Sequence, residues 1–187
     1  NGISKFIQGS SIPQKPVFEN YNLWDGLQGN KFNQRSAIQD ADGYLYFGGK
    51  NGFNRFDPLK IKKDENPPPV ILTEFLLADN TELYPGSPEA YIDKQISLAK
   101  QVKLNYKQRS FTINYVALNY LIPQKNAYKY KLEGFEEAWN NAGHRHSATY
   151  TNLDPGKYTF HVIASNGSDV WNYSGTRLQI IILPPWY

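Results

Sequence analysis

The second half of the chain alternates apolar and polar residues with a period of two, which is the pattern of strands that bury one face. Turn signals such as Asn166-Gly167 separate the alternating stretches. The apolar members of the successive sets are Val102, Leu104 and Tyr106; Phe111, Ile113, Tyr115 and Ala117; Tyr128, Tyr130 and Leu132; Tyr158, Phe160, Val162 and Ala164; and Leu178, Ile180 and Ile182. This arrangement predicts a β-sandwich of about seven strands, of the immunoglobulin or fibronectin-III-like kind.

The segment TNLDPGKYTFHVIASNGSDVW, residues 151–171, indicates how one of these strands begins. Pro155 and Gly156 form a turn, and Tyr158 follows at the head of the strand. Immunoglobulin-like sandwiches place a tyrosine corner at this point, with the hydroxyl bonded to upstream backbone. We therefore predict structural roles for Pro155, Gly156 and Tyr158. His161 falls on the opposite face of the same strand, where we expect it at the surface.

The first third of the chain has a different pattern, in which short strand-like runs are joined by hairpin turns. The stretches NGISKF at 1–6 and NGFNRF at 51–56 share the pattern Asn-Gly-apolar-polar-basic-Phe, 50 residues apart. A repeat of about this length is typical of propeller blades. Asp42-Gly43 and Asn51-Gly52 are strong signals for two-residue hairpin loops. The chain is therefore expected to begin with the last blade or blades of a truncated β-propeller.

The stretch ENPPPV, residues 65–70, separates the two patterns. Each proline fixes its own φ and holds the preceding residue extended, so the stretch predicts a stiff connector. We expect an all-β chain with two domains: residues 1–66 from the propeller and residues 67–187 forming the sandwich.

Composition narrows the classes of partner. The net charge of +3 is spread along the 187 residues, and the basic cluster Lys60, Lys62 and Lys63 is followed at once by Asp64 and Glu65. Nucleic-acid binders concentrate positive charge on one face, so we expect no nucleic-acid partner. The chain has no cysteine, which excludes disulfides and thiolate chemistry within it. The longest apolar run, residues 180–183, is far shorter than the roughly 20 residues of a membrane-spanning helix.

Candidate metal ligands are few. His144 and His146 in GHRHS have the spacing of two ligands on one strand face, but no third ligand is evident nearby. The DADG stretch at 40–43 begins like a calcium loop without its later ligands, and a hairpin turn explains it better. We expect no metal site and no cofactor.

Three carboxylates close to an aromatic residue raise the possibility of a glycosidase. Glu133, Glu136 and Glu137 precede Trp139, and glycosidases use two carboxylates that flank the sugar. The pattern places Glu136 and Glu137 in a polar loop between strands and favours packing of Trp139 into the sandwich. We therefore predict no catalytic residue.

Aromatic side chains in the blade are the best ligand-binding candidates. Tyr21, Trp24 and Tyr44 have the amphipathic rings that stack on sugars. The alternative, packing of these aromatics between neighbouring blades, is also open.

The C-terminal PPWY offers a link to a membrane. Pro184 and Pro185 stop the strand and form a semi-rigid spacer. Trp186 and Tyr187 are residue types that favour the membrane–water boundary. If the protein continues into a spanning helix beyond residue 187, these four residues connect the sandwich to it; the alternative is a terminus with incidental aromatics.

Two stretches resemble known families. LWDGLQGNKFNQRSAIQDADGYLYFGGKNGFNRFDP, residues 23–58, resembles the two-component regulator propeller repeat. YKYKLEGFEEAW, TYTNLDPGKYTFHVIASNGSDVW and IIILPPWY resemble the three-tyrosine (Y_Y_Y) domain over about residues 94–187. The residues that carry the second resemblance, and its predicted structural motif, are Tyr128, Tyr130, Trp139, Pro155, Gly156 and Tyr158.

The order of the two modules resembles the periplasmic sensor region of a hybrid two-component histidine kinase. This resemblance implies a non-catalytic, membrane-proximal relay part of an inner-membrane protein that responds to oligosaccharides from polysaccharide breakdown. The implied partners are the rest of the propeller, a second copy bound through the sandwich, an oligosaccharide on the intact sensor, and the adjacent membrane. The alternative is a carbohydrate-binding or accessory β-sandwich module of a secreted glycoside hydrolase.

Overall fold

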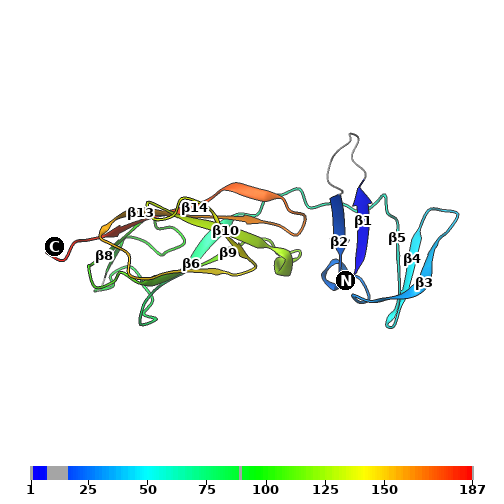
Figure 1. The fold of residues 1–187 in the computed structure, drawn as a ribbon, viewed down its shortest axis with the longest axis horizontal. Helices are drawn as coiled ribbons and strands as arrows, with labels where there is room; N and C mark the ends of the chain where they lie inside the picture. Colours follow the sequence, from blue (N-terminus) through cyan, green and yellow to red (C-terminus); the bar gives the residue numbers. More distant parts are fainter. Residues whose placement is uncertain (1, 8–16, 89, 187) are drawn as a thin grey trace. The chain divides into compact units, whose positions relative to one another are not determined.

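The computed structural model describes residues 2–7, 17–88 and 90–186 (Figure 1). In these ranges the regular elements are β-strands, apart from two 3₁₀ turns, η1 (Leu23–Asp25) and η2 (Pro123–Lys125). The all-β class predicted from the sequence is confirmed. The chain divides into two compact units, which we call unit 1 (Asn1–Lys63) and unit 2 (Asp64–Tyr187).

The described residues of unit 1 form two small antiparallel sheets. Its strands are β1 (Ile3–Ile7) and β2 (Val17–Tyr21), which pair with each other, and β3 (Phe32–Gln39), β4 (Leu45–Gly49) and β5 (Gly52–Phe56), in the order β3-β4-β5. The two echoed sequence stretches thus fall on β1 and β5. Gly43 has the positive φ of +87° that the turn before β4 requires, and Asp40 Oδ1 accepts hydrogen bonds from the turn.

Both faces of the β3-β4-β5 sheet carry apolar side chains. On one face the Phe47 ring stacks on Phe56 at 5.8 Å and meets Phe32 edge-on at 6.0 Å. On the other face Ile38 and Phe53 remain 69% and 67% exposed. A small sheet that leaves apolar groups on both faces is typical of a propeller blade, because each blade is covered by its neighbours.

Unit 2 is a sandwich of two sheets, and the described residues contribute nine strands rather than about seven. The six-stranded sheet has the order β11-β10-β13-β14-β8-β7 and the three-stranded sheet the order β12-β9-β6. The extra strands are short, such as β7 and β11. The bounds are β6 (Val70–Leu77), β7 (Ala90–Ile92), β8 (Gln101–Leu104), β9 (Phe111–Ala117), β10 (Ala127–Glu133), β11 (Asn140–Gly143), β12 (Ser147–Tyr150), β13 (Gly156–Ser165) and β14 (Trp171–Ile182).

The core of unit 2 lies between these sheets and contains almost every apolar residue that the alternation selected. Phe160, Val162, Leu178 and Ile180 are each 0% exposed, for example. The exception is Tyr106, which is 39% exposed because β8 ends at Leu104 and a turn follows. The period of two therefore predicts the buried face correctly, but only as far as each strand extends.

The outer face of β13 differs from the prediction. His161 was expected at the surface, yet it is 4% exposed, and Ile163 and Ser165 on the same face are also buried. The indole of Trp139 lies 4.9 Å from the His161 ring, centroid to centroid. Trp139 itself is 43% exposed, so it covers the outside of the sheet instead of packing between the sheets, as the sequence had suggested. The position of the Trp139 ring outside the sheet explains both the burial of His161 and the absence of Trp139 from the core.

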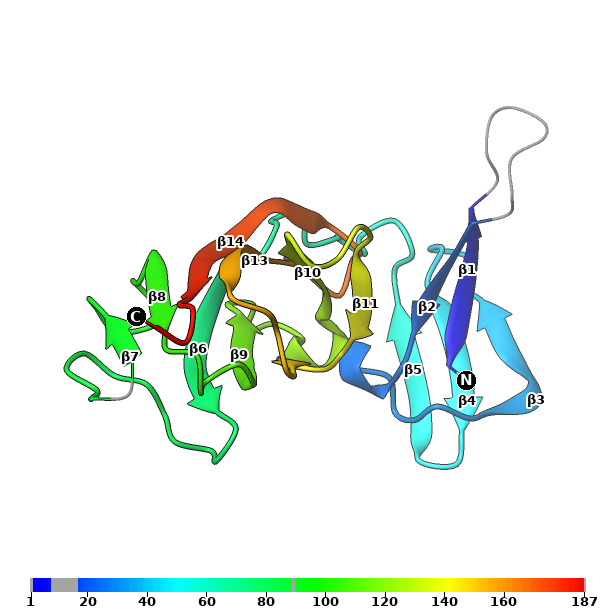
Figure 2. The ribbon, with the colours of Figure 1, turned by 60° about the vertical axis from the view of Figure 1, so that its left-hand side comes forward.

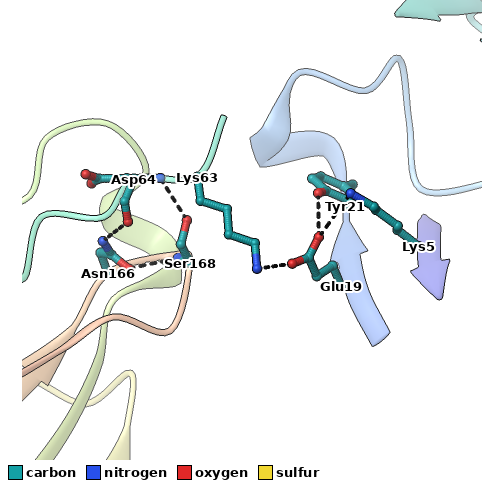
Figure 3. Close-up of polar contacts among 7 residues, drawn as sticks. All are labelled: Lys5, Glu19, Tyr21, Lys63, Asp64, Asn166 and Ser168. Atoms are coloured by element: carbon teal, nitrogen blue, oxygen red, sulfur yellow. Dashed lines mark hydrogen bonds and ion pairs between the residues drawn. The ribbon is translucent and has the colours of Figure 1, made fainter. Parts of the chain in front are cut away.

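The boundary between the units falls between Lys63 and Asp64, three residues before the predicted one. The reason is a set of hydrogen bonds inside unit 2. Asn166 donates to the carbonyl oxygen of Asp64 at 2.7 Å (Figure 3) and to that of Asn66 at 3.0 Å, and thereby attaches the start of the connector to the sandwich.

Candidate functional site

The predicted ligand-binding aromatics of unit 1 lie in three different environments. Tyr21 is half-buried, and its hydroxyl donates to Glu19 at 3.2 Å. Trp24, in η1, is 54% exposed. Tyr44 is half-buried, with the Arg55 guanidinium 3.6 Å from its ring centroid. Within the described residues no ring contact joins these three side chains.

Sequence reasoning missed a polar and aromatic cluster around Arg55. Arg55 Nε donates to the Tyr46 hydroxyl at 2.9 Å, and that hydroxyl donates to Asp40 Oδ2, also at 2.9 Å. Desolvation acts to raise the pKa of Asp40, but hydrogen bonds from Tyr46 and from the turn backbone lower it overall. The register that places Tyr46 opposite Arg55 could have revealed the cluster. The arrangement fixes the Arg55 side chain across two tyrosine rings on the outside of the sheet.

The tyrosines of the predicted structural motif have distinct roles in unit 2. The Tyr128 side chain is fully buried, and its hydroxyl accepts a hydrogen bond from the Ala117 backbone N–H at 3.0 Å. The Tyr158 hydroxyl donates to the carbonyl of Asp154 at 2.8 Å, which is the geometry of a tyrosine corner. Tyr130 is half-buried and packs against the core. The turn at Pro155 and Gly156 brings Asp154 back toward the Tyr158 hydroxyl.

An aromatic cluster joins the two sheets. The Tyr115 ring, on β9, lies 5.2 Å from Tyr128 and 6.2 Å from Phe160, which belong to the facing sheet. Tyr150, on β12, meets Phe160 and Tyr130 edge-on at 6.3 Å each. Burial raises the pKa values of Tyr115 and Tyr150 far above their ordinary range, so both stay neutral. These contacts connect β9 and β12 to β10 and β13 as one packed body.

The carboxylates near Trp139 are separated by the β10 strand. Glu136 Oε2 accepts hydrogen bonds from the Leu132 N–H at 2.6 Å and from the Tyr150 hydroxyl at 3.1 Å, so it closes the loop over the core. Glu133 Oε1 lies on the outer side, 4.0 Å from both His161 and Arg177. The two carboxylates contact opposite faces of the sheet, and this is not the flanking pair that a glycosidase needs.

The two loop histidines are bound to their own surroundings. His144 Nδ1 lies 2.7 Å from the Asn126 carbonyl oxygen, and the His146 ring packs edge-on against Tyr128 at 5.2 Å. Among residues 2–7, 17–88 and 90–186 there is no group of three His, Asp or Glu side chains that could hold a metal ion.

The predicted link to a membrane begins where the parallel strands β14 and β8 end side by side. Ile182 of β14 pairs in parallel with Leu104 of β8, and the Leu183 N–H donates to the Leu104 carbonyl at 2.9 Å. Pro184 is half-buried, Pro185 is exposed, and Trp186 is 81% exposed; Tyr187 lies outside the described residues. No helix of the described part is long and apolar enough to cross a membrane.

β14 reaches from one end of the sandwich to the other. Its 12 residues extend about 40 Å at the usual rise of a strand, and β13 pairs with it along most of that length. Figure 2 shows β14 running beside β13 and ending next to β8, where the C terminus lies. The turn at 166–170, which holds the connector, is at the opposite end of this hairpin. The connector and the exit of the chain are therefore joined by one pair of strands, whose register shifts once, between Val162 and Ala164.

Comparisons with known proteins agree with this architecture. Residues 119–183 match the Y_Y_Y domain family. The chain is 35% identical over 167 residues to a histidine kinase of Formosa agariphila, a match that covers 89% of this chain and 12% of the relative.

Solved structures that match the chain are also extracellular domains of two-component systems. The extracellular domain of a B. thetaiotaomicron protein, described as a hybrid two component system, matches with a TM-score of 0.71 and 27% identity. That match covers 89% of this chain and 22% of the other. A second B. thetaiotaomicron extracellular domain, with the same description, matches with a TM-score of 0.58 and 26% identity over 91% of this chain and 22% of the other.

These matches show what the chain is similar to. It resembles the extracellular sensor region of hybrid two-component histidine kinases, and residues 119–183 match the Y_Y_Y domain family, as the sequence resemblance predicted. Such sensor regions do not carry the catalytic part of these systems. The location that the solved relatives indicate is extracytoplasmic. The chain spans about an eighth of the kinase relative and about a fifth of the solved ones.

Proposed function

We propose that this chain is the membrane-proximal relay of an extracytoplasmic sensor that responds to oligosaccharides. In this proposal the parent protein is a hybrid histidine kinase of the inner membrane, and the chain passes a conformational signal without catalysing a reaction. The β13–β14 hairpin is the observation that carries the proposal. It runs from the attached connector to the residue where the chain leaves the sandwich.

Rigid packing is what a relay of this kind requires. The aromatic cluster fixes the two sheets to each other, so a displacement at the connector end cannot be absorbed by sliding of one sheet over the other. Pro184 and Pro185 restrict the backbone directly after β14. A spanning helix beyond residue 187 would receive the displacement through these two prolines and through Trp186 and Tyr187.

In this proposal the propeller binds the ligand and the sandwich forms the contact between two copies. The ligand, an oligosaccharide, binds the intact propeller, most of which lies outside this chain. Tyr21, Trp24 and Tyr44 contribute a small part of that surface, because most blades of the propeller lie outside this chain. Two copies pack through their sandwiches, and ligand binding changes this packing. A ligand can shift the equilibrium only by its preference for one arrangement over the other.

Calorimetry with a panel of oligosaccharides tests whether the ligand binds the intact propeller rather than this chain. We expect the intact extracytoplasmic region to bind a member of the panel and the 187-residue chain to bind none. Tight binding by the 187-residue chain alone would contradict the proposal and favour a carbohydrate-binding module instead.

An insertion tests the relay in the full-length protein. Two residues, Gly-Ser, placed after Pro185 should abolish ligand-induced transcription of a reporter while the affinity for the oligosaccharide stays unchanged. The matched control is the same insertion between Tyr120 and Leu121, which are 84% and 77% exposed in a loop. Normal induction by the protein with the insertion after Pro185 would show that the tail does not transmit the signal.

A further inference from the structure

The proline-rich connector, residues 65–70, and Asp64 before it are bonded to the sandwich at five backbone carbonyls, those of Asp64, Asn66, Pro68, Pro69 and Val70. The Asn172 side chain donates to the Pro68 carbonyl at 3.0 Å, and the Thr176 hydroxyl donates to the Val70 carbonyl. The Leu118 N–H donates to the Pro69 carbonyl at 2.8 Å, and Pro68 is buried. Prolines cannot donate backbone hydrogen bonds, but their carbonyls accept them. The stretch predicted as a stiff connector is therefore part of unit 2.

Asn166 makes the first of these attachments and uses every part of its amide. Its Nδ2 donates to the carbonyls of Asp64 and Asn66, as described above. Its Oδ1 accepts from the N–H groups of Ser168 at 2.9 Å and Val170 at 3.0 Å. The residue is 1% exposed. A buried amide of this kind specifies one geometry, because either half left unpaired has a high cost.

Ser168 adds a contact to the same point of the connector. Its hydroxyl accepts a hydrogen bond from the Asp64 N–H at 3.2 Å, so both the N–H and the carbonyl of Asp64 are held by the 166–170 turn. Figure 3 shows the two side chains converging on Asp64 from that turn.

The preceding residue is held by unit 1. The Lys63 ammonium forms an ion pair with Glu19 Oε1, and the side chain of Glu19 is only 16% exposed. The other carboxylate oxygen, Oε2, accepts from the Tyr21 hydroxyl and lies 3.9 Å from the Lys5 ammonium. The hydrogen bond from Lys63 is the main reason why the pKa of Glu19 is lowered. Lys63 and Asp64 are thus bound, each within its own unit, at adjacent positions of the chain.

We propose that the joint between the units is the backbone at Lys63–Asp64, and that Asn166 is the positioning residue through which the end of the propeller acts on β14. The three prolines do not bend or swivel, because they belong to the sandwich. A change at Lys63 then reaches Asn166 through one residue, and from the 166–170 turn it enters β14. The location of the joint follows from the contacts alone, whereas its use in signalling rests on the proposed function.

The joint is tested by proteolysis of the 187-residue chain with glutamyl endopeptidase, which cuts after Glu65. The variant Asn166→Asp is nearly isosteric and keeps the Oδ1 acceptor for Ser168 and Val170. It replaces the donor with a carboxylate oxygen that faces two carbonyls. We expect cleavage at Glu65–Asn66 to become about tenfold faster or more, because cleavage needs local opening of the connector.

Two control variants separate the joint from general destabilisation. Asn141→Asp makes the same chemical change at an exposed position of β11, and it should leave the cleavage rate unchanged. Lys63→Met releases the contact with Glu19 but not the attachment of Asp64, so cleavage after Glu65 should also stay slow. An unchanged rate in Asn166→Asp, or a rate that rises equally in Asn141→Asp, would overturn the proposed joint.

Should Asn166→Asp lower the melting temperature of the whole sandwich, Thr176→Val provides a second test. It removes only the bond to the Val70 carbonyl, and hydrogen exchange of the Leu118 amide, which donates to the neighbouring Pro69 carbonyl, should then rise while that of the β10 amides stays constant. In the full-length sensor, Asn166→Asp should reduce reporter induction with unchanged oligosaccharide affinity. Normal induction together with faster cleavage would keep the joint but refute its role in signalling.

Discussion

Replacing each tyrosine of the structural motif by phenylalanine should destabilise unit 2 to three different extents. The order follows from what each hydroxyl does. In Tyr128→Phe the Ala117 N–H loses its partner in a fully buried position. In Tyr158→Phe the Asp154 carbonyl loses its partner near the surface, where water can replace it. In Tyr130→Phe the half-buried ring stays in the aromatic cluster.

The magnitudes follow from these environments. A buried donor left unpaired costs about 1–3 kcal/mol, so we expect about 2 kcal/mol for Tyr128→Phe. An ordinary hydrogen bond contributes about 1 kcal/mol net, which is the expectation for Tyr158→Phe. Tyr130→Phe should stay within about 0.5 kcal/mol of the parent chain. These values are decreases in the free energy of unfolding of unit 2.

Urea unfolding followed by tryptophan fluorescence measures this series. The chain has four tryptophans, and Trp24→Phe leaves only Trp139, Trp171 and Trp186, which all belong to unit 2. Fluorescence in that background therefore reports the unfolding of the sandwich alone. The midpoints should fall in the order Tyr130→Phe, Tyr158→Phe, Tyr128→Phe, with equal m-values.

Equal losses for Tyr128→Phe and Tyr130→Phe would refute the reasoning. That result would mean that the Ala117 N–H forms another hydrogen bond in Tyr128→Phe, or that the specific hydrogen bonds of the tyrosine hydroxyls do not contribute to the stability of unit 2. A loss at Tyr158→Phe greater than at Tyr128→Phe would indicate that the tyrosine corner, rather than the buried contact to β9, holds the sandwich together.

Two further predictions concern the β13–β14 pair. Burial lowers the pKa of His161, so the folded state disfavours its charged form. The free energy of unfolding should therefore fall as the pH drops below the unfolded-state pKa of about 6.5. Urea titrations at several pH values should show a weaker fall in His161→Gln, and an equal fall in both proteins would contradict this prediction. Gly175 has a φ of +51°, and a Cβ there would lie 2.1 Å from the Val162 carbonyl oxygen. Gly175→Ala should therefore lower the free energy of unfolding by about 3 kcal/mol. The matched control is Gly143→Ala, for which we expect about 1 kcal/mol, because Gly143 has a similar φ but open space around it. Equal losses of thermal stability in the two variants would exclude the clash at Gly175.

The sequence by itself determined the longer strands, the turns between them and the face of each that points into the core. Asp42-Gly43 and the turn before Tyr158 are specified by local backbone chemistry, and the period of two places Phe160 and Val162 in the core whatever lies opposite them. The resemblance to sensor regions of hybrid histidine kinases could also be predicted, because its motifs are local stretches of residues. Local rules of this kind need no knowledge of distant segments.

The tertiary structure decided which outer faces are covered and which residues are joined. His161 is buried because the loop after β10 lays Trp139 over it, and the alternation within β13 carries no information about that loop. Asn166 holds the connector although 100 residues separate it from Asn66. The Ser168 and Asn172 contacts span similar separations. Such contacts depend on where the chain returns in space, so the sequence predicts a stiff connector, and only the fold shows that the 166–170 turn holds it.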